Sequence, residues 1–231
     1  MKPPSSFTAV VPAAGVGKRM AAGLPKQYLP LLGSTVLEHT LNRLLEHPAI
    51  GRVIVATAEH DHWFPALAIA RDPRVLRVNG GKERADSVLN ALARVETDWV
   101  LVHDAARPCL HPADLEAVLA AGRQHEGAIL ACRVRDSMKR GDGHGAISGS
   151  VSRDELWHAL TPQCFATRPL REALAAALAA GCDITDEASA MEWAGFRPRL
   201  VEGRADNIKI TRPEDLGLAG FFLQQMIESE Q

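Results

Sequence analysis

The feature that most restricts the fold of this chain is an alternation along residues 1–135. Short runs rich in β-branched residues alternate there with longer segments of helical periodicity. Such alternation is typical of βαβ units and a mostly parallel sheet. Buried strands are expected over five segments, namely Thr8–Val11, Arg52–Ala56, Val75–Val78, Trp99–His103 and Ala128–Val134. The sequence therefore predicts an α/β fold.

Three segments between these strands carry their apolar residues on one helical face and are expected to be helices: Thr35–Glu46, Arg84–Val95 and Pro112–Gly122. In the first of them, Thr35 and Glu38 have the spacing of a capping box, which marks a helix start. Strands and helices are therefore expected to alternate strictly.

The pattern breaks at Asp136, where four glycines among charged residues offer little to a core up to about Ser152. This stretch is interpreted as an excursion from the domain. Helices are expected at Pro169–Ala180, Asp186–Ala194 and Thr211–Ile227, and strands at Arg199–Val201 and Asn207–Ile210. Thr211 and Glu214 suggest a capping box for the last helix, with Pro213 in its first turn. We expect one domain over residues 1–231, with an inserted arm at about 136–156.

Composition excludes several classes of protein. The chain has 231 residues, 46% of them hydrophobic, and a net charge of −2, as expected of a soluble globular protein. Balanced charge argues against a protein that coats nucleic acid or an anionic membrane, but not against a small anionic ligand. The longest uncharged stretch, Pro3–Gly17, is too short and broken for a membrane helix, and no secretory signal is expected. Four widely spaced cysteines without a CxxC pair indicate free thiols in a reducing cytoplasm.

The most informative segment is the small-residue loop after the first strand, Pro-Ala-Ala-Gly-Val-Gly-Lys-Arg, followed by Pro-Lys-Gln. It is not a dinucleotide fingerprint, because Met20 stands where a third glycine is needed, and Pro12 excludes a Walker A loop. One interpretation is a plain glycine turn beside solvated cations. The other is a phosphate site, which is favoured because three cations and no acid lie between residues 15 and 26.

This loop resembles that of the sugar-phosphate nucleotidyltransferases. Four further segments are similar, in order and spacing, to the 2-C-methyl-D-erythritol 4-phosphate cytidylyltransferase family: Gly80–Val88, His103–Pro108, Ile184–Ala188 and Gly203–Lys209. The resemblance covers nearly the whole chain. It implies a Rossmann-like sheet flanked by helices, with a projecting β-arm used in dimerisation.

The activity implied by the resemblance is conversion of CTP and 2-C-methyl-D-erythritol 4-phosphate to 4-diphosphocytidyl-2-C-methyl-D-erythritol and pyrophosphate, in non-mevalonate isoprenoid biosynthesis. Such chemistry requires anions to be positioned and their charge stabilised, so it needs cations more than a protein nucleophile. One alternative is a cytidylyltransferase acting on ribitol 5-phosphate or another polyol phosphate. A second is a nucleotide-binding regulator without catalysis, against which Arg19, Lys26, Asp104 and Lys209 argue.

The resemblance also implies roles for individual residues on the nucleotide side. Arg19 and Lys26 would stabilise the transition state, and Asp104 would lie close to Mg²⁺. Gly80, Gly81 and Ser87 would recognise the cytosine edge. The full nucleotide-binding set is Pro12, Ala13, Ala14, Gly15, Gly17, Gly80, Gly81, Ser87, Asp104 and Ala105. Two simpler interpretations stay open: Gly80–Ser87 is a polar helix entry, and Asp104 caps a turn before Pro108.

On the acceptor side, the resemblance implies a homodimer in which each arm reaches the substrate of the other subunit. The implied acceptor-binding residues are Arg107, Ser137, Arg153, Thr185, Asp206 and Lys209. Ser137 departs from the family's usual threonine and keeps only its hydroxyl. From the residues alone, interpretation of the arm as a solvated loop is favoured. His103 is expected to be structural, because the histidines show no metal-ligand spacing.

Overall fold

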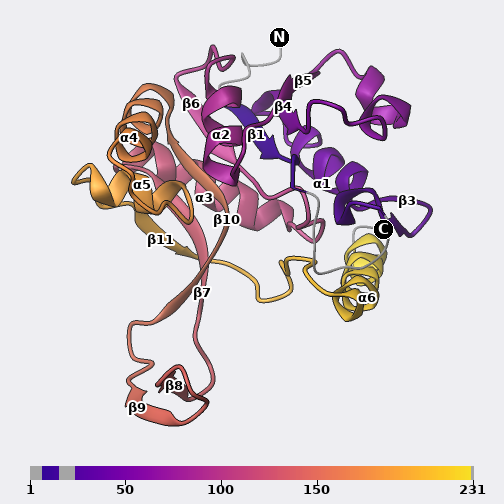
Figure 1. Ribbon diagram of the computed structural model, residues 1–231. Helices are drawn as coiled ribbons and strands as arrows, with labels where there is room; N and C mark the ends of the chain where they lie inside the picture. Colours follow the sequence, from indigo (N-terminus) through magenta and orange to yellow (C-terminus); the bar gives the residue numbers. More distant parts are fainter. Residues whose placement is uncertain (1–6, 16–23, 230–231) are drawn as a thin grey trace.

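The computed structural model describes residues 7–15 and 24–229. A seven-stranded sheet lies at the centre, with strand order β11-β7-β10-β6-β1-β4-β5 (Figure 1). Its strands are β1 (Phe7–Pro12), β4 (Ile50–Thr57), β5 (Val75–Asn79), β6 (Trp99–Val102), β7 (Ala128–Arg133), β10 (Trp157–Ala166) and β11 (Arg199–Glu202). Every pair is parallel except those made by β10, which runs antiparallel to both β6 and β7. The predicted α/β fold with a mostly parallel sheet is confirmed.

Helices cover both faces of the sheet. Because side chains alternate along a strand, Ala9 and Val11 of β1 join one apolar cluster and Val10 joins another. The first cluster includes α1 (Val36–Leu45) and α3 (Pro112–Gln124); the second includes α2 (Arg84–Leu92), α4 (Thr167–Ala179) and α5 (Glu187–Trp193). A third cluster forms under α6 (Pro213–Ser229). These layers leave the ends of the parallel strands open for a site.

Short elements fill two of the connections. Between β1 and α1 lie a 3-10 helix η1 (Lys26–Tyr28) and the paired strands β2 (Pro30–Leu31) and β3 (Ser34–Thr35). Between β4 and β5, where strict alternation would place an α-helix, the chain forms only two 3-10 helices, η2 (Phe64–Ala66) and η3 (Ala68–Arg71). No helix of the described residues is long and apolar enough to cross a membrane.

The two predicted capping boxes had different outcomes. At α1, Thr35 Oγ1 accepts the N–H of Glu38, and the Glu38 carboxylate accepts the N–H of Thr35, each at 3.2 Å. At α6 the prediction was wrong. There Asp215 Oδ2 accepts the N–H groups of Thr211 and Arg212, each at 2.8 Å. Glu214 is largely exposed and points its carboxylate toward Arg212 instead, so one acid has taken over the capping role expected of its neighbour.

Strand β10 was missed by the sequence analysis. Pro162 lies inside it, and a proline argues against a central strand because it has no N–H for the ladder. The structure accommodates Pro162 at a register shift between Ala159 and Gln163, so the strand continues on both sides. Leu160 to Phe165 are buried, as expected of a strand between two neighbours.

The predicted strand Asn207–Ile210 was also wrong. Its β-branched residues suggested a strand, but this segment pairs with no strand of the sheet. The N–H of Ile210 donates to the carbonyl of Ala106 at 2.9 Å, and the side chain of Asn207 donates to the carbonyl of Thr161 at 2.8 Å. The segment therefore closes over the end of β6, where it brings Lys209 to the sheet edge.

The predicted arm contains a small antiparallel hairpin, β8 (Met138–Gly141) and β9 (Ile147–Val151), inside residues 136–156. Figure 1 shows it projecting away from the sheet and helices. Asp142 Oδ1 shapes its turn by accepting the N–H groups of His144 and Ala146. Ile147 is 69% exposed at the hairpin. As predicted, this segment contributes nothing to the three apolar clusters.

Candidate active site

A cavity of about 300 Å³ opens at the carboxyl ends of the parallel strands, where open α/β sheets bind ligands. Its walls come from the loop after β1, the entry of α2, the loop after β6, η1 and the segment before α6. Nine of the predicted nucleotide-side residues line it, namely Pro12, Ala13, Ala14, Gly15, Lys26, Gly81, Ser87, Asp104 and Ala105, and Lys209 joins them. Gly80 is absent from the lining. Arg19 and Gly17 lie outside the described residues.

Two glycines allow the entry of α2 to approach the loop after β1. A Cβ at Gly80 would lie only 2.5 Å from the Cβ of Ala14, and one at Gly81 would lie 2.2 Å from the Cβ of Asp86. The N–H of Gly81 donates to Ser87 Oγ at 2.9 Å, and that hydroxyl donates to the carbonyl of Glu83 at 3.1 Å. Close packing therefore gives both glycines a structural role. Their contact with cytosine stays a prediction.

The loop after β1 is fixed by a residue to which the sequence analysis gave no role. Gln27 is buried, and its Nε2 donates to the carbonyls of Ala13 at 2.7 Å and Gly15 at 3.1 Å. The neighbouring Lys26 donates from Nζ to the carbonyl of Ile210 at 2.8 Å. The Pro-Lys-Gln motif thus places a cation on the cavity wall and braces the loop opposite it.

Asp104 lies at the centre of a cluster of cations. Its Oδ1 is 3.1 Å from Nε of Arg84, and its Oδ2 is 2.8 Å from Nζ of Lys209 and 3.4 Å from Nε of Arg107. Burial raises the pKa of the Asp104 carboxyl, but the three cations outweigh this effect and hold that pKa well below its usual range. Asp104 is therefore ionised across the physiological pH range.

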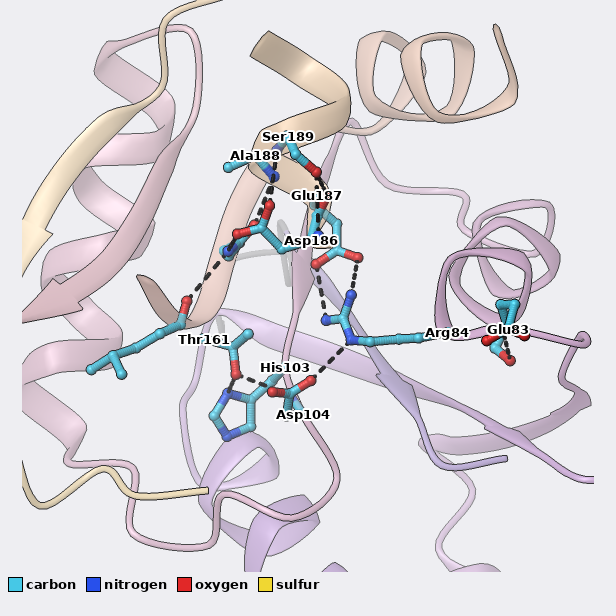
Figure 2. A network of polar contacts seen from close by, with 12 residues as sticks. Glu83, Arg84, His103, Asp104, Thr161, Asp186, Glu187, Ala188 and Ser189 are labelled. Atoms are coloured by element: carbon cyan, nitrogen blue, oxygen red, sulfur yellow. Dashed lines mark hydrogen bonds and ion pairs between the residues drawn. The ribbon is translucent and has the colours of Figure 1, made fainter. Parts of the chain in front are cut away.

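Arg84 and Glu187 belong to the site but were not predicted. Figure 2 shows Arg84 between two carboxylates: Nη1 and Nη2 contact Glu187 at 2.7 and 3.1 Å, while Nε faces Asp104. Burial lowers the pKa of Arg84, but the carboxylates of Glu187 and Asp104 reverse the shift and raise it. Both residues occur in segments that resemble the family, yet no local spacing reveals an ion pair between residues so far apart in sequence.

His103 is structural, as expected. It is fully buried beside Asp104 and does not line the cavity. One ring nitrogen lies 3.0 Å from the carbonyl of Arg107 and the other 3.1 Å from Oγ1 of Thr161. Burial lowers the pKa of His103 to about 4, so the ring is neutral. The Thr161 hydroxyl also accepts the N–H of Asp104 at 3.0 Å, which gives Thr161 the role that the sequence did not reveal.

A second cavity of about 230 Å³ shares three residues with the first, Arg84, Asp104 and Lys209. Three predicted acceptor residues line it, namely Arg107, Thr185 and Lys209. Arg107 is held there by Nη1, which donates to the carbonyl of Asn207 at 2.7 Å. The two cavities therefore meet at one carboxylate and its cations.

The structure does not bring the other three predicted acceptor residues to this place. Asp206 lines neither cavity, and its carboxylate pairs with the guanidinium of Arg204. Ser137 and Arg153 are exposed at the arm, where the guanidinium of Arg153 donates to the carbonyl of Arg135. Within one subunit, neither arm residue lines the site.

The acidic residues of the site fit a metal only if the substrate supplies further ligands. Among the residues that the structure describes, no group of three or more His, Cys, Asp or Glu side chains could hold a metal ion. Mg²⁺ is commonly held by one or two carboxylates together with substrate phosphates. The single Asp104 carboxylate at the junction fits that kind of site, and it does not fit a site made by protein ligands alone.

Comparison with known proteins identifies the family. The family model described as "IspD: 2-C-methyl-D-erythritol 4-phosphate cytidylyltransferase" matches residues 7–225. The chain belongs to this family. It is 67% identical to the 2-C-methyl-D-erythritol 4-phosphate cytidylyltransferase of Aeromonas hydrophila subsp. hydrophila, over 95% of this chain and 90% of the relative. The protein of the same name from Shewanella amazonensis is 60% identical, over 95% and 94% of the two chains.

A crystal structure agrees with these sequence matches. A 4-diphosphocytidyl-2C-methyl-D-erythritol synthase superimposes with a TM-score of 0.82 at 39% identity, covering 94% of this chain and 98% of that one. The chain is therefore an enzyme, a CTP-using cytidylyltransferase of non-mevalonate isoprenoid biosynthesis. The regulator without catalysis is set aside, and the acceptor of the family replaces the ribitol 5-phosphate alternative.

Proposed function

We propose that the first cavity holds CTP and the second holds 2-C-methyl-D-erythritol 4-phosphate, so that their phosphates meet at Asp104. An oxygen of the acceptor phosphate attacks the α-phosphorus of CTP. A new P–O bond forms there as the bond to the β-phosphate breaks, and pyrophosphate leaves with the electron pair. The observation that carries this proposal is the shared wall of the two cavities, formed by Arg84, Asp104 and Lys209.

The charges of this wall suit a reaction between anions. Lys26 lines the nucleotide cavity, Arg107 lines the acceptor cavity, and Lys209 faces both. Fixed cations bring the two substrates together and stabilise charge that develops on the pyrophosphate. In this proposal Lys26 acts on the transition state, together with Arg19, whose role rests on the sequence resemblance alone. The acceptor phosphate is already ionised near neutral pH, so no protein base is required.

The proposal assigns Mg²⁺ to Asp104, together with phosphate oxygens of CTP. When bound, such a cation would neutralise negative charge on the triphosphate. The support is that Asp104 is ionised, lines both cavities and is kept in place by Arg84, Arg107 and the hydroxyl of Thr161. Gly81 and Ser87, which line the same cavity, are proposed to select cytosine together with the adjacent Gly80.

We further propose that the enzyme works as a homodimer, with Ser137 and Arg153 of one subunit serving the acceptor cavity of the other. Two observations support this assignment. The arm projects from the body (Figure 1), and Ile147 on it is 69% exposed. Neither Ser137 nor Arg153 lines the acceptor cavity of its own subunit. Asp206, whose carboxylate is bonded to Arg204, is proposed only to orient sugar hydroxyls at the rim.

The experiment that tests the acceptor is a comparison of substrates. The enzyme is incubated with CTP, Mg²⁺ and either 2-C-methyl-D-erythritol 4-phosphate or ribitol 5-phosphate, and pyrophosphate release is followed. We expect release with the first acceptor and little with the second. Turnover of ribitol 5-phosphate without turnover of the methylerythritol phosphate would contradict the proposal. Omitting the acceptor controls for simple hydrolysis of CTP.

A further inference from the structure

Glu187 lies beyond the residues expected to touch either substrate, yet its carboxylate is almost fully buried against the site. We infer that Glu187 is a positioning residue for Asp104, which acts through Arg84. It holds the Arg84 guanidinium so that only Nε reaches Asp104 and the carboxylate stays available to the cavities. The inference rests on the proposed function, because it is the role of Asp104 in binding the metal and CTP that Glu187 would protect.

The hydrogen bonds of Arg84 carry this inference. Glu187 takes both terminal nitrogens, with Nη1 at 2.7 Å from Oε1 and Nη2 at 3.1 Å from Oε2. This is the fork geometry in which arginine and carboxylate bind most specifically. Nε alone is left for Asp104, at 3.1 Å from Oδ1 (Figure 2). Glu187 thus decides which of the two neighbouring carboxylates receives the arginine fork.

The alternative arrangement would compete with the substrates. Without the charge of Glu187, the terminal nitrogens of Arg84 lose their ionic partner, and the other carboxylate in contact with Arg84 is that of Asp104. A fork turned onto Asp104 would occupy both of its oxygens, including Oδ2, which now lies 2.8 Å from Lys209. Asp104 would then be less available to a cation, and Lys209 would lose its present position between the cavities.

Glu187 is well placed for this task because its backbone is fixed independently of Arg84. It is the first residue of α5, directly after Asp186, whose Oδ1 accepts the N–H of Ser189 at 2.9 Å. Gln163 of β10 donates to Asp186 Oδ2 and accepts the N–H of Ala188, each at 2.9 Å. A change confined to the side chain of Glu187 should therefore leave the helix start intact and alter mainly the orientation of Arg84.

The test compares Glu187→Gln, Arg84→Gln and the double variant with the wild type. Mn²⁺ is titrated calorimetrically into each protein saturated with CTP, and kcat is measured separately. Substitution of a residue that orients a metal ligand commonly lowers metal affinity or activity by about 10- to 100-fold. We expect Glu187→Gln to weaken Mn²⁺ binding and lower kcat by amounts in that range. The double variant should be no worse than Arg84→Gln, because Glu187 acts through Arg84.

A matched control is Glu172→Gln on α4, which removes the same charge from an exposed pair with Arg168 and should change neither quantity. Wild-type Mn²⁺ affinity and kcat in Glu187→Gln would overturn the inference, as would losses that add fully in the double variant. If thermal unfolding shows that Glu187→Gln does not fold, Glu187→Asp takes its place. Aspartate keeps the charge, but its side chain is one methylene shorter and places the carboxylate farther from Arg84. An intermediate loss of Mn²⁺ affinity and kcat is therefore expected. Unchanged Mn²⁺ affinity would contradict the inference.

The two proposals can fail separately. A wild-type enzyme that releases no pyrophosphate from CTP and 2-C-methyl-D-erythritol 4-phosphate would remove the proposed function. The Mn²⁺ titration needs no turnover, so it tests whether Glu187 positions Asp104 in either case.

Discussion

The ammonium of Lys209 lies 2.8 Å from the carboxylate of Asp104, at the place where two cavities meet. The Lys209 side chain is 37% exposed, whereas that of Asp104 is 9% exposed. A buried anion thus holds a partly solvated cation in position before any phosphate arrives. Preorganised charge of this kind lowers a barrier without the cost of reorganising solvent during the reaction.

Lys26→Ala should lower kcat much more than it weakens CTP binding. Removing a group that stabilises transition-state charge costs about 2.7–4 kcal/mol of activation free energy, or about 10²- to 10³-fold in kcat. Stopped-flow or steady-state kinetics and CTP calorimetry measure the two quantities. Arg168→Ala, which removes a cation from the exposed surface of α4, is the control. Equal losses in kcat and CTP affinity would show that Lys26 serves ground-state binding instead.

Thr185→Val should raise KM for the acceptor and leave KM for CTP unchanged, because Thr185 lines only the second cavity. Loss of one hydrogen bond is worth about 0.5–1.5 kcal/mol, which corresponds to about a twofold to tenfold change in KM. Steady-state kinetics with each substrate varied in turn provides the measurement. Thr185→Ser keeps the hydroxyl and should stay close to wild type. A change confined to KM for CTP would indicate that the second cavity binds CTP, contrary to the proposal.

Gly80→Ala should weaken CTP binding and lower the melting temperature. The new methyl would lie 2.5 Å from the Cβ of Ala14 and 2.9 Å from Oγ of Ser87, so the loop after β1 or the start of α2 must move. Overpacking of this kind costs about 1–3 kcal/mol. Gly217→Ala on α6 is the control, since apart from the adjoining residues and backbone of α6 itself no atom lies within 4 Å of the new methyl. Unchanged CTP affinity in Gly80→Ala would mean that the loop tolerates the displacement.

The cysteines should divide into two reactivity classes. Burial raises the pKa of Cys109 and of Cys164 to about 12, while Cys132 and Cys182 are only half-buried. A thiol reagent at about pH 8 should label Cys132 and Cys182 in the native protein and all four only after unfolding. The Cys132→Ser/Cys182→Ser variant should show no fast phase of labelling by the thiol reagent in the native protein. Equal labelling rates for the four thiols would contradict this division.

The same two buried thiols imply a dependence of stability on alkaline pH. Their folded pKa lies above the ordinary value of 9, so the folded state binds more protons than the unfolded state between about pH 9 and 12. Their contribution to the free energy of unfolding is therefore complete below about pH 9 and is lost as pH rises toward 12. Urea unfolding at several pH values, with Cys109→Ala/Cys164→Ala as the comparison, measures the slope.

Mixing two inactive variants should restore activity if the arm serves the partner's site. In a heterodimer of Lys26→Ala and Arg153→Ala, one site carries both changes and the other carries neither. A one-to-one mixture that exchanges subunits at random should therefore regain about a quarter of wild-type activity. Activity no higher than that of the separate variants, or a monomer by sedimentation, would contradict the arrangement in trans.

The sequence predicted the parts of the site that depend on local pattern. Thr35 and Glu38 lie at capping spacing, and β1, β5 and β6 are short runs rich in apolar and β-branched residues, so the sheet edge and the loops following these strands could be placed. Asp104 was then expected at the carboxyl end of β6 because parallel strands end at a common edge. The nucleotide-binding residues themselves were implied by the family resemblance, and those that line the first cavity lie in or next to the loops at this edge.

The parts that were missed depend on contacts between distant segments. Nothing in the local sequence distinguishes Gln27 and Arg84 from other polar residues. Only folding brings the Gln27 side chain to the carbonyl of Ala13 and the Arg84 guanidinium to the carboxylate of Glu187. Pro162 hid β10, and Asp215 took over the capping role expected of its neighbour Glu214. Local propensity does not encode such choices, since they are decided by tertiary packing.

β10, the strand that runs antiparallel to its neighbours in the seven-stranded sheet, joins the arm to the reaction centre within one stretch of backbone. β10 begins at Trp157, where the arm returns to the sheet, and soon supplies Thr161, whose hydroxyl holds the N–H of Asp104. It then supplies Gln163, which anchors Asp186 and the start of α5. One strand therefore connects the projecting hairpin with the residues that hold both carboxylates of the Arg84 ion pairs, so the arm and the reaction centre share a continuous support.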